Sequence, residues 1–331
     1  MTFTAQIPAT MKAWACRAYG GPEVLALEER PVPTPKDDEV LVKIRATTVA
    51  SGDWRIRSLK LPRGLGLFGR LALGFTKPRK PVLGMEFSGV VAAVGKSVTG
   101  FKPGDAVFGF PGVALGCHAE YRVMQVTKPI ALKPSNLSFE EAASLPFGAM
   151  SALDYLHKAK LKPGERLLVI GASGAVGSAM VQLGKHMGAI VTGVTSGRNI
   201  ELVQSLGADT LIDYNSTDFT KAGESWDVIA DTVAASTFAK CLPVLNEQGR
   251  YLAIAGGLPD LLARPKGTKK SIGGPAAEKP EDFAEVARLA EAGVLTPVID
   301  KVFSFDQMQD AHAYVDTGRK RGSVVVTVGE K

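Results

Sequence analysis

The chain has 331 residues, more than the roughly 250 to 300 at which a single core stops growing, so we expect two domains. Its 45% hydrophobic and 22% charged residues are close to the average of soluble globular proteins and exclude an intrinsically disordered chain. The net charge of +6 comes from side chains scattered along the chain, which argues against a nucleic-acid partner and is compatible with a small anionic ligand.

Cysteine spacing and the first residues indicate the cellular compartment. Cys16, Cys117 and Cys241 are odd in number and far apart, so neither a disulfide framework nor a C-x-x-C metal motif is present. Residues 1–12 lack the charged head, apolar stretch and cleavage site of a secretory signal. No apolar run reaches the roughly 18 uncharged residues of a membrane-spanning helix. We therefore expect a cytoplasmic protein with no membrane partner.

Short β-strands dominate the expected structure of the first 135 residues. Residues 40–46 alternate apolar and polar side chains, which is typical of a half-buried strand, and residues 86–94 and 105–110 are further strand candidates. Proline and glycine turns separate these segments. The pattern predicts a mostly-β domain, either a barrel or a sandwich.

Strands and helices alternate after residue 135, and Ser138 followed by Glu141 predicts the capped start of the first helix. Strands are expected at residues 166–170, 189–195, 210–213, 227–233 and 250–255, and helices at 175–187, 201–206 and 238–245. This alternation predicts a doubly wound parallel sheet of the Rossmann type. A helix at 283–292 and strands at 298–303 and 323–328 follow, and this tail is expected to rejoin the first domain.

A glycine-rich turn joins the expected strand 166–170 to the expected helix 175–187. Glycines let the backbone turn sharply and approach a pyrophosphate, while the free amides of the helix N-terminus hold its negative charge. The alternative, a merely structural tight turn, explains the following α/β units less well. The predicted dinucleotide-binding residues here are Gly171, Ser173, Gly174, Ala175, Val176 and Gly177.

The choice between NADH and NADPH is expected after the second strand of the α/β part. An acidic residue there would bond the ribose 2′-hydroxyl and repel a 2′-phosphate. The sequence instead has Thr195, Ser196 and Arg198, of which the serine and the arginine can donate hydrogen bonds to a phosphate. We therefore predict NADPH as the cofactor. The alternative is that Arg198 is a solvent-exposed loop residue with no ligand.

Short segments spread over nearly the whole chain form one recognisable series. They are residues 40–53 with Arg57, 84–91, 94–95, 101–109, 119–121, 145–146, 151–152, the glycine-rich turn, 206–209 and 212–214. In this order they resemble the medium-chain dehydrogenase/reductase superfamily, specifically its zinc-free quinone oxidoreductase-like branch. The resemblance implies a GroES-like catalytic domain of residues 1–135 and 296–331, a Rossmann domain of residues 136–295, a cleft between them, and a homodimer.

The resemblance also implies roles for residues outside the glycine-rich turn. Ser151 is expected near the nicotinamide, Tyr214 near the adenosine 2′-phosphate, and residues 231–233, including Val233, on the adenosine side. Ala255 is expected to follow the cofactor along the sheet edge, and Arg319 or Arg321 to lie near the phosphate.

Zinc ligands are missing where zinc-dependent relatives carry them. Ala50 and Met85 occupy the positions of a Cys and a His, Pro146 or Phe147 that of a second Cys, and three dispersed cysteines cannot build a four-cysteine lobe. We therefore predict no metal. His118 is the one imidazole expected near the cleft. It is expected to be either a structural loop residue or a catalytic residue.

Without a metal, the substrate has to accept hydride readily, as quinones and the conjugated double bonds of enones or enals do. We predict NADPH-dependent reduction of such a compound, with Ser51 donating to the developing oxyanion and Asp53 orienting Ser51 or a water. A structural ion pair of Asp53 with Arg57 is the alternative for this aspartate. An alcohol dehydrogenase or carbonyl reductase, and a non-catalytic NADPH-binding protein, remain alternatives for the whole chain.

Residues 58–81 combine apolar side chains with Gly and Arg and form a longer loop than relatives have. They are expected either to close the cleft as an apolar lid or to pack against the barrel or a dimer partner.

Overall fold

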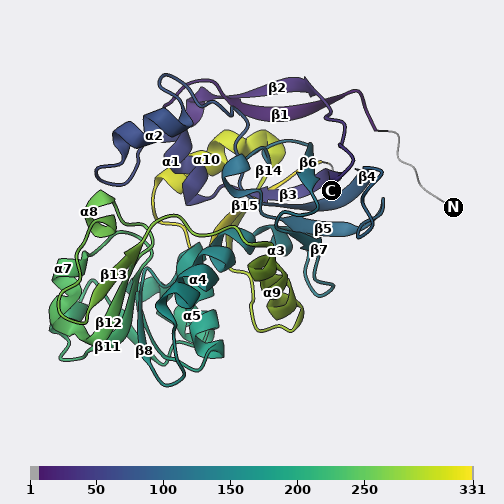
Figure 1. Cartoon of the computed structure of the whole chain (residues 1–331). Helices are drawn as coiled ribbons and strands as arrows, with labels where there is room; N and C mark the ends of the chain where they lie inside the picture. Colours follow the sequence, from purple (N-terminus) through teal and green to yellow (C-terminus); the bar gives the residue numbers. More distant parts are fainter. Residues whose placement is uncertain (1–6, 330–331) are drawn as a thin grey trace.

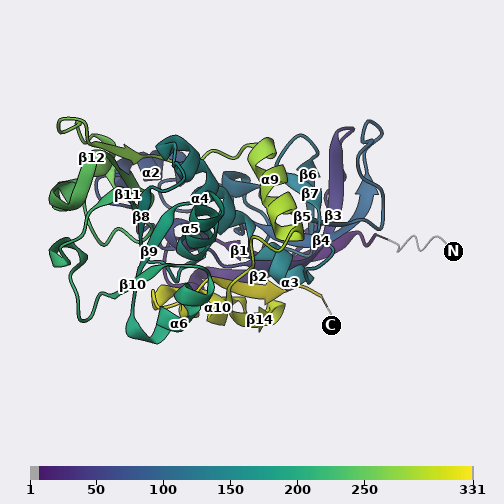
Figure 2. The same ribbon diagram turned by 90° about the horizontal axis from the view of Figure 1, so that it is seen from below.

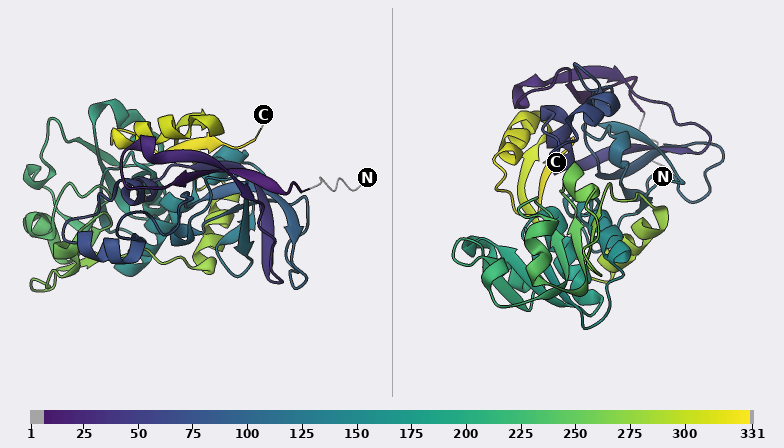
Figure 3. Two further views of the ribbon diagram at one scale, coloured as in Figure 1. Left: turned by 90° about the horizontal axis from the view of Figure 1, so that it is seen from above. Right: turned by 60° about the vertical axis from the view of Figure 1, so that its left-hand side comes forward.

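The computed structural model describes residues 7–329, which form two lobes around two separate sheets (Figure 1). In the right-hand view of Figure 3 the purple N-terminal strands and the yellow C-terminal segments share one lobe, and the green and teal α/β units form the other. Within residues 7–329, no helix is long and apolar enough to cross a membrane.

The first lobe is built on a seven-stranded sheet in which strands from both parts of the chain pair with each other. Its strands are β3 (Glu39–Thr48), β4 (Phe87–Val94), β5 (Ala106–Gly109), β6 (Tyr121–Gln125), β7 (Ile130–Leu132), β14 (Ile299–Ser304) and β15 (Ser323–Thr327). The C-terminal strand β15 pairs antiparallel with β3, as the expected return of the tail to the first domain requires. A separate hairpin consists of β1 (Thr10–Cys16) and β2 (Leu25–Pro31).

Four helices cover this lobe: α1 (Ser51–Ser58), α2 (Gly66–Leu73), α3 (Phe139–Ala143) and α10 (Met308–Asp316). Helix α3 begins as predicted, because the Ser138 hydroxyl accepts the Glu141 amide at 3.1 Å and the Glu141 carboxylate accepts the Ser138 amide at 2.8 Å. The helices α1, α2 and α10 lie beneath the β1–β2 hairpin in Figure 1.

The second lobe contains a six-stranded parallel sheet in the order β10-β9-β8-β11-β12-β13. These strands are β8 (Arg166–Ile170), β9 (Ile190–Thr195), β10 (Thr210–Asp213), β11 (Trp226–Asp231), β12 (Leu245–Ala253) and β13 (Lys270–Gly273). The helices of this half are α4 (Pro146–Ala159), α5 (Ala175–His186), α6 (Ile200–Ser205), α7 (Phe238–Cys241), α8 (Leu258–Leu261) and α9 (Pro280–Glu291).

Alternate residues of the buried strand β8 face helices on opposite sides of this sheet. Leu167 and Val169 belong to the core that includes α4 and α5, whereas Leu168 and Ile170 pack with Phe238 of α7. Burial on both faces explains the uninterrupted apolar run of β8 and confirms the doubly wound parallel sheet. Helix α9 then connects the lobes, because it packs beside α4 (Figure 2). Its Phe283 ring lies 4.7 Å from that of Phe108 in β5.

Two expectations on local structure are wrong. The helix expected at 238–245 ends at Cys241, because Pro243 cannot continue it; a single 3-10 turn follows and Leu245 already begins β12. The ion pair of Asp53 with Arg57 does not form. The buried Arg57 guanidinium instead pairs with Asp316 of α10 and donates to the Gly20 carbonyl at 2.6 Å, which ties α1 to α10.

Candidate active site

The glycine-rich turn has the geometry that a bound pyrophosphate requires. Gly171 follows β8 directly and adopts φ +80°, and Gly174 caps the N-terminus of α5. A Cβ on Gly177 would lie 2.1 Å from the Gly171 carbonyl oxygen, so this glycine permits the close approach of α5 to the turn. A Cβ on Gly174 would meet only that same oxygen, at 3.4 Å, and the space above the turn is otherwise open to a ligand.

Hydroxyl groups from the turn and from the end of β9 form one small network. Thr195 donates to the Ser173 hydroxyl at 3.0 Å, and Asn199 donates to both Ser173 and Ser196, at 3.0 and 3.2 Å. Thr195 is buried, Ser196 is half-buried and Arg198 is exposed. The network therefore fixes the positions of the predicted polar residues, while Ser196 and Arg198 keep access to solvent and to a ligand.

Tyr214 and Arg198 lie toward this same edge, and Arg321 lies close by. The Tyr214 amide donates to the Thr195 carbonyl at 3.1 Å, and its side chain is 62% exposed, free to contact a ligand. Arg198 donates to the Arg319 carbonyl at 3.1 Å, so the two predicted basic segments lie next to each other. The Arg321 side chain is bound to Asp300 at 3.1 Å, which neutralises part of its charge.

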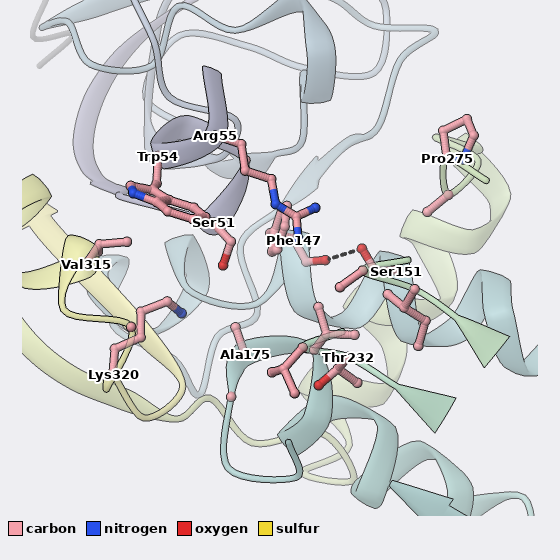
Figure 4. A pocket seen from close by; sticks show the side chains of 18 of the residues that line it. Ser51, Trp54, Arg55, Phe147, Ser151, Ala175, Thr232, Pro275, Val315 and Lys320 are labelled. Carbon is pink, nitrogen blue, oxygen red and sulfur yellow. Dashed lines mark hydrogen bonds between the residues drawn. The ribbon is translucent and has the colours of Figure 1, made fainter. Parts of the chain in front are cut away.

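A cleft of about 430 Å³ lies between the two lobes, next to the glycine-rich turn (Figure 4). Its walls include seven of the predicted site residues, namely Ser51, Ser151, Gly174, Ala175, Val176, Val233 and Ala255. The remaining predicted cofactor residues, Gly171, Ser173, Gly177, Thr195, Ser196, Arg198, Tyr214 and Arg321, do not line it. The cleft thus joins the glycine-rich turn to the predicted catalytic serine.

Asp53 lies behind the cleft wall and does not line it. Its side chain is fully buried, and its two oxygens accept the amides of Ala50 at 2.9 Å and Gly84 at 2.8 Å. Burial raises the pKa of Asp53, and these hydrogen bonds oppose that rise. The carboxylate therefore holds the start of α1, on which Ser51 sits, against the loop before β4.

Glu86 plays a similar part for α4. Its carboxylate accepts the Phe147 amide at 2.6 Å and a hydrogen bond from Thr48, while Ser151 donates to the Phe147 carbonyl at 2.8 Å. Burial raises the pKa of Glu86 to about 7. Glu86 thereby fixes the N-terminal part of α4, from whose first two turns Phe147 and Ser151 project into the cleft.

Comparisons with known proteins agree with this architecture. The alcohol dehydrogenase GroES-like domain matches residues 36–134, and the zinc-binding dehydrogenase family matches residues 206–326. The 2-methylene-furan-3-one reductase of Solanum lycopersicum is 37% identical over 97% of this chain and 80% of its own length. The chloroplastic NADPH-dependent alkenal/one oxidoreductase of Arabidopsis thaliana is 32% identical over 98% of this chain and 82% of its own. The chain belongs to the medium-chain dehydrogenase/reductase superfamily.

A solved structure extends this relationship to three dimensions. The quinone oxidoreductase from Coxiella burnetii superposes with a TM-score of 0.82 at 26% identity, covering 97% of this chain and all of that one. The chain is accordingly an oxidoreductase of this superfamily, with a GroES-like domain and a Rossmann-like parallel sheet. The predicted fold class and family are confirmed.

Several cleft residues of this superfamily member were not predicted. Trp54 and Arg55 come from α1, Phe147 and Tyr155 from α4, and Lys320 from the turn before β15. Adjacency to the predicted Ser51 was a signal for the first two. For Lys320 the only signal was the basic run 319–321, from which Arg319 and Arg321 were predicted instead.

Lys320 is the cation closest to the glycine-rich turn inside the cleft. Its ammonium donates to the Gly322 carbonyl at 2.6 Å, and the Gly322 amide donates to the Ser173 carbonyl at 2.8 Å. Its side chain points into the cavity opposite Ser51, near Ala175 (Figure 4). Burial lowers the pKa of Lys320 to about 8, against the opposing influence of Glu86. This places a titratable positive charge beside the N-terminus of α5.

His118 is wholly buried and does not line the cleft. Its Nε2 lies 3.0 Å from the Thr48 carbonyl, and its ring stacks edge-on against His312 at 5.4 Å. Within residues 7–329, no group of three or more His, Cys, Asp or Glu side chains is arranged to hold a metal ion.

The segment 58–81 bridges the two lobes at one side of the cleft. The Leu258 amide of α8 donates to the Arg63 carbonyl at 2.8 Å, so the loop after α1 touches the Rossmann lobe. Helix α2 within this segment exposes Leu67, Phe68 and Leu71 and does not line the cleft. The segment therefore contacts both lobes, as expected for a lid. Its helix α2, however, faces solvent and not the cleft.

Proposed function

We propose that this protein is an NADPH-dependent oxidoreductase that transfers hydride, without zinc, to a quinone or to the conjugated double bond of an enone or enal. One observation carries the proposal: the glycine-rich turn opens into a cleft shared with the opposite lobe, where Ser51 faces the cofactor side. The names of the relatives from tomato, Arabidopsis and Coxiella burnetii support the substrate class.

The described residues fit the cofactor in three places. The N-terminus of α5 and the open space above Gly174 fit a pyrophosphate, and Lys320 adds positive charge beside it. Ser196, Arg198 and Tyr214 fit the adenosine 2′-phosphate. Ser151 and Ala255 line the inner cleft, where they fit the nicotinamide. When bound, NADPH supplies the hydride.

The chain's own residues would bind and polarise the electrophile. Ser51 donates a hydrogen bond to the oxygen on which negative charge develops, and Asp53 acts as a positioning residue that holds α1. Phe147 and Trp54 provide apolar walls that exclude water, and a proton reaches the product from solvent or a nearby donor. Zinc is not part of this proposal, despite the name of the matching family, because Ala50, Met85 and Phe147 offer no zinc ligand.

We further propose a cytoplasmic homodimer whose GroES-like domain comprises residues 1–135 and 296–331 and whose Rossmann domain comprises residues 136–295. The pairing of β15 with β3 supports the assignment of the tail to the first domain. Light scattering coupled to size-exclusion chromatography tests the dimer.

The first prediction is that purified protein treated with a metal chelator oxidises NADPH when given 1,2-naphthoquinone or short enones and enals. The measurement is the loss of reduced-nicotinamide absorbance across this panel, with NADH in parallel and simple alcohols plus NADP⁺ as the reverse test. Turnover only of alcohols and simple ketones would instead identify an alcohol dehydrogenase or carbonyl reductase. Tight NADPH binding with no turnover of any compound would identify a non-catalytic binding protein.

The second prediction concerns cofactor choice. Arg198→Ala is expected to lower kcat/KM for NADPH about tenfold, because a charge-assisted hydrogen bond to the 2′-phosphate contributes roughly 1.4 kcal/mol at an exposed site. The value for NADH, which lacks that phosphate, should hardly change. Arg264→Ala, which removes an exposed arginine from another loop of the same half, is the control. Equal losses with both cofactors would show that Arg198 does not read the phosphate.

A further inference from the structure

Three charged side chains line the cleft, and they differ in how they are paired. Asp316 is bound by the buried Arg57, and Lys320 donates to the Gly322 carbonyl. Arg55 is half-buried and has no carboxylate or other hydrogen-bond partner among residues 7–329. Burial alone lowers the pKa of its guanidinium, with no acidic neighbour to oppose the effect. One cation in the cleft is therefore left for a ligand.

A half-buried guanidinium with no protein partner can gain hydrogen bonds when an anion binds it. A guanidinium carries five N–H donors in a planar fork, and partial burial removes part of the water that would otherwise satisfy them. Carboxylates and phosphates match this fork with two parallel hydrogen bonds. The site thus has the chemistry of an anion subsite, and the structure places it inside the cleft rather than on the surface.

The position of Arg55 relative to Ser51 indicates which anion it would meet. The two residues are four apart on α1, so they lie on the same face of the helix, and both point into the cavity beside Phe147 (Figure 4). Lys320 enters the cavity from the C-terminal turn, near Ala175 and the glycine-rich turn. The two cations therefore approach from different elements, Lys320 on the pyrophosphate side and Arg55 on the side of Ser51.

We infer that Arg55 binds an anionic group of the substrate, so that the preferred electrophile is an enone or enal that carries a carboxylate near its conjugated carbonyl. This inference rests on the proposed function for the reaction itself. It adds a substrate class, in which Ser51 contacts the carbonyl oxygen and Arg55 the carboxylate. The other anion in reach is the pyrophosphate of the cofactor, and the experiment below separates the two.

The test compares 4-oxopent-2-enoate with its uncharged methyl ester, at saturating NADPH, in the wild type and in Arg55→Gln. The ester is intrinsically more electrophilic than the acid, so the two substrates cannot be compared directly within one protein. The informative quantity is the ratio of kcat/KM for the acid to kcat/KM for the ester, compared between the wild type and Arg55→Gln. Arg55→Gln is expected to lower this ratio at least tenfold. Lys60→Gln removes an exposed positive charge just after the same helix and should leave the ratio unchanged, which controls for long-range electrostatics.

Cofactor binding provides the second arm. If Arg55 holds the pyrophosphate, Arg55→Gln weakens NADPH binding and leaves the acid-to-ester ratio unchanged, and this result would overturn the inference. An equal loss of ratio in Lys60→Gln would overturn it as well, because a general field rather than Arg55 would then be responsible.

A binding measurement separates failure of the inference from failure of the proposed function. The saturated acid 4-oxopentanoate cannot be reduced at a double bond, yet it carries the same carboxylate and carbonyl. Calorimetric titration into the NADP⁺ complex is expected to show binding that weakens at least tenfold in Arg55→Gln. If 4-oxopentanoate binding depends on Arg55 but no enone or enal is reduced, the proposed reaction is wrong and the anion subsite is supported. If the wild type and Arg55→Gln bind 4-oxopentanoate equally, the anion subsite is wrong.

Discussion

Gly177→Ala is expected to weaken NADPH binding at least a hundredfold and to lower the free energy of unfolding by about 2 kcal/mol, the usual cost of overpacking. The added Cβ would lie 2.1 Å from the Gly171 carbonyl oxygen and 2.8 Å from the Ala172 Cα, both of which are backbone atoms that cannot rotate away. Helix α5 would have to move off the turn, which displaces the helix N-terminus proposed to bind the pyrophosphate. Fluorescence titration with NADPH and thermal unfolding without cofactor measure the two effects.

Gly174→Ala is the informative partner variant. Its Cβ would have one neighbour at 3.4 Å, an ordinary contact, and its backbone lies in the extended region, so stability should hardly change. The methyl group would nevertheless stand in the space assigned to the phosphate and weaken NADPH binding. Gly100→Ala, where nothing lies within 4 Å, should affect neither property. If Gly174→Ala bound NADPH normally, the cofactor would not pass over this turn.

The α/β half of the chain was largely predictable because its signals are local. The strands β8 and β10 begin and end at the predicted residues, since each is a short apolar run bounded by turn residues or charges. Helix α4 gave only one such signal, Pro146 at its first position. It lacks a side-chain cap and is buried on most of its circumference, so its apolar residues do not follow a helical period. The break at Pro243 shows the opposite case, in which a single residue overrides an otherwise helical pattern.

Without the family resemblance, which also pointed to Ser51, Ser151 and Ala255, the site could be predicted only where one segment builds it. The glycine-rich turn is such a segment, and its residues lie as expected next to β8 and α5. Arg55 and Lys320 enter the cleft for non-local reasons: α1 is held by Asp53 and by the Arg57–Asp316 pair, and the turn before β15 is held by Ser173. Those partners lie between about 30 and 260 residues apart in the chain, and no pattern in one sequence reports such pairings.

Lys320→Gln is expected to weaken NADPH binding about ten- to a hundredfold, because a charge-assisted hydrogen bond to a phosphate contributes roughly 1.5 to 3 kcal/mol. The pH dependence is the sharper readout. With a pKa of about 8, Lys320 is positively charged below pH 8 and loses its charge as the pH rises through that value. Wild-type affinity for NADPH should therefore fall between pH 7 and 9. The cofactor does not titrate in this range, because its pyrophosphate is fully ionised and the second pKa of its 2′-phosphate is near 6.

The two variants of Lys320 distinguish its charge from its shape. Lys320→Gln should show weak binding that hardly varies between pH 7 and 9, because glutamine does not titrate. Lys320→Arg should restore most of the affinity and also remove the pH dependence, because arginine stays charged throughout this range. A pH dependence that survived in Lys320→Gln would assign it to another group, and Glu86 would be the next candidate, since burial brings its pKa to about 7. Glu86 would then act through the first turn of α4, and Glu86→Gln would abolish the dependence instead.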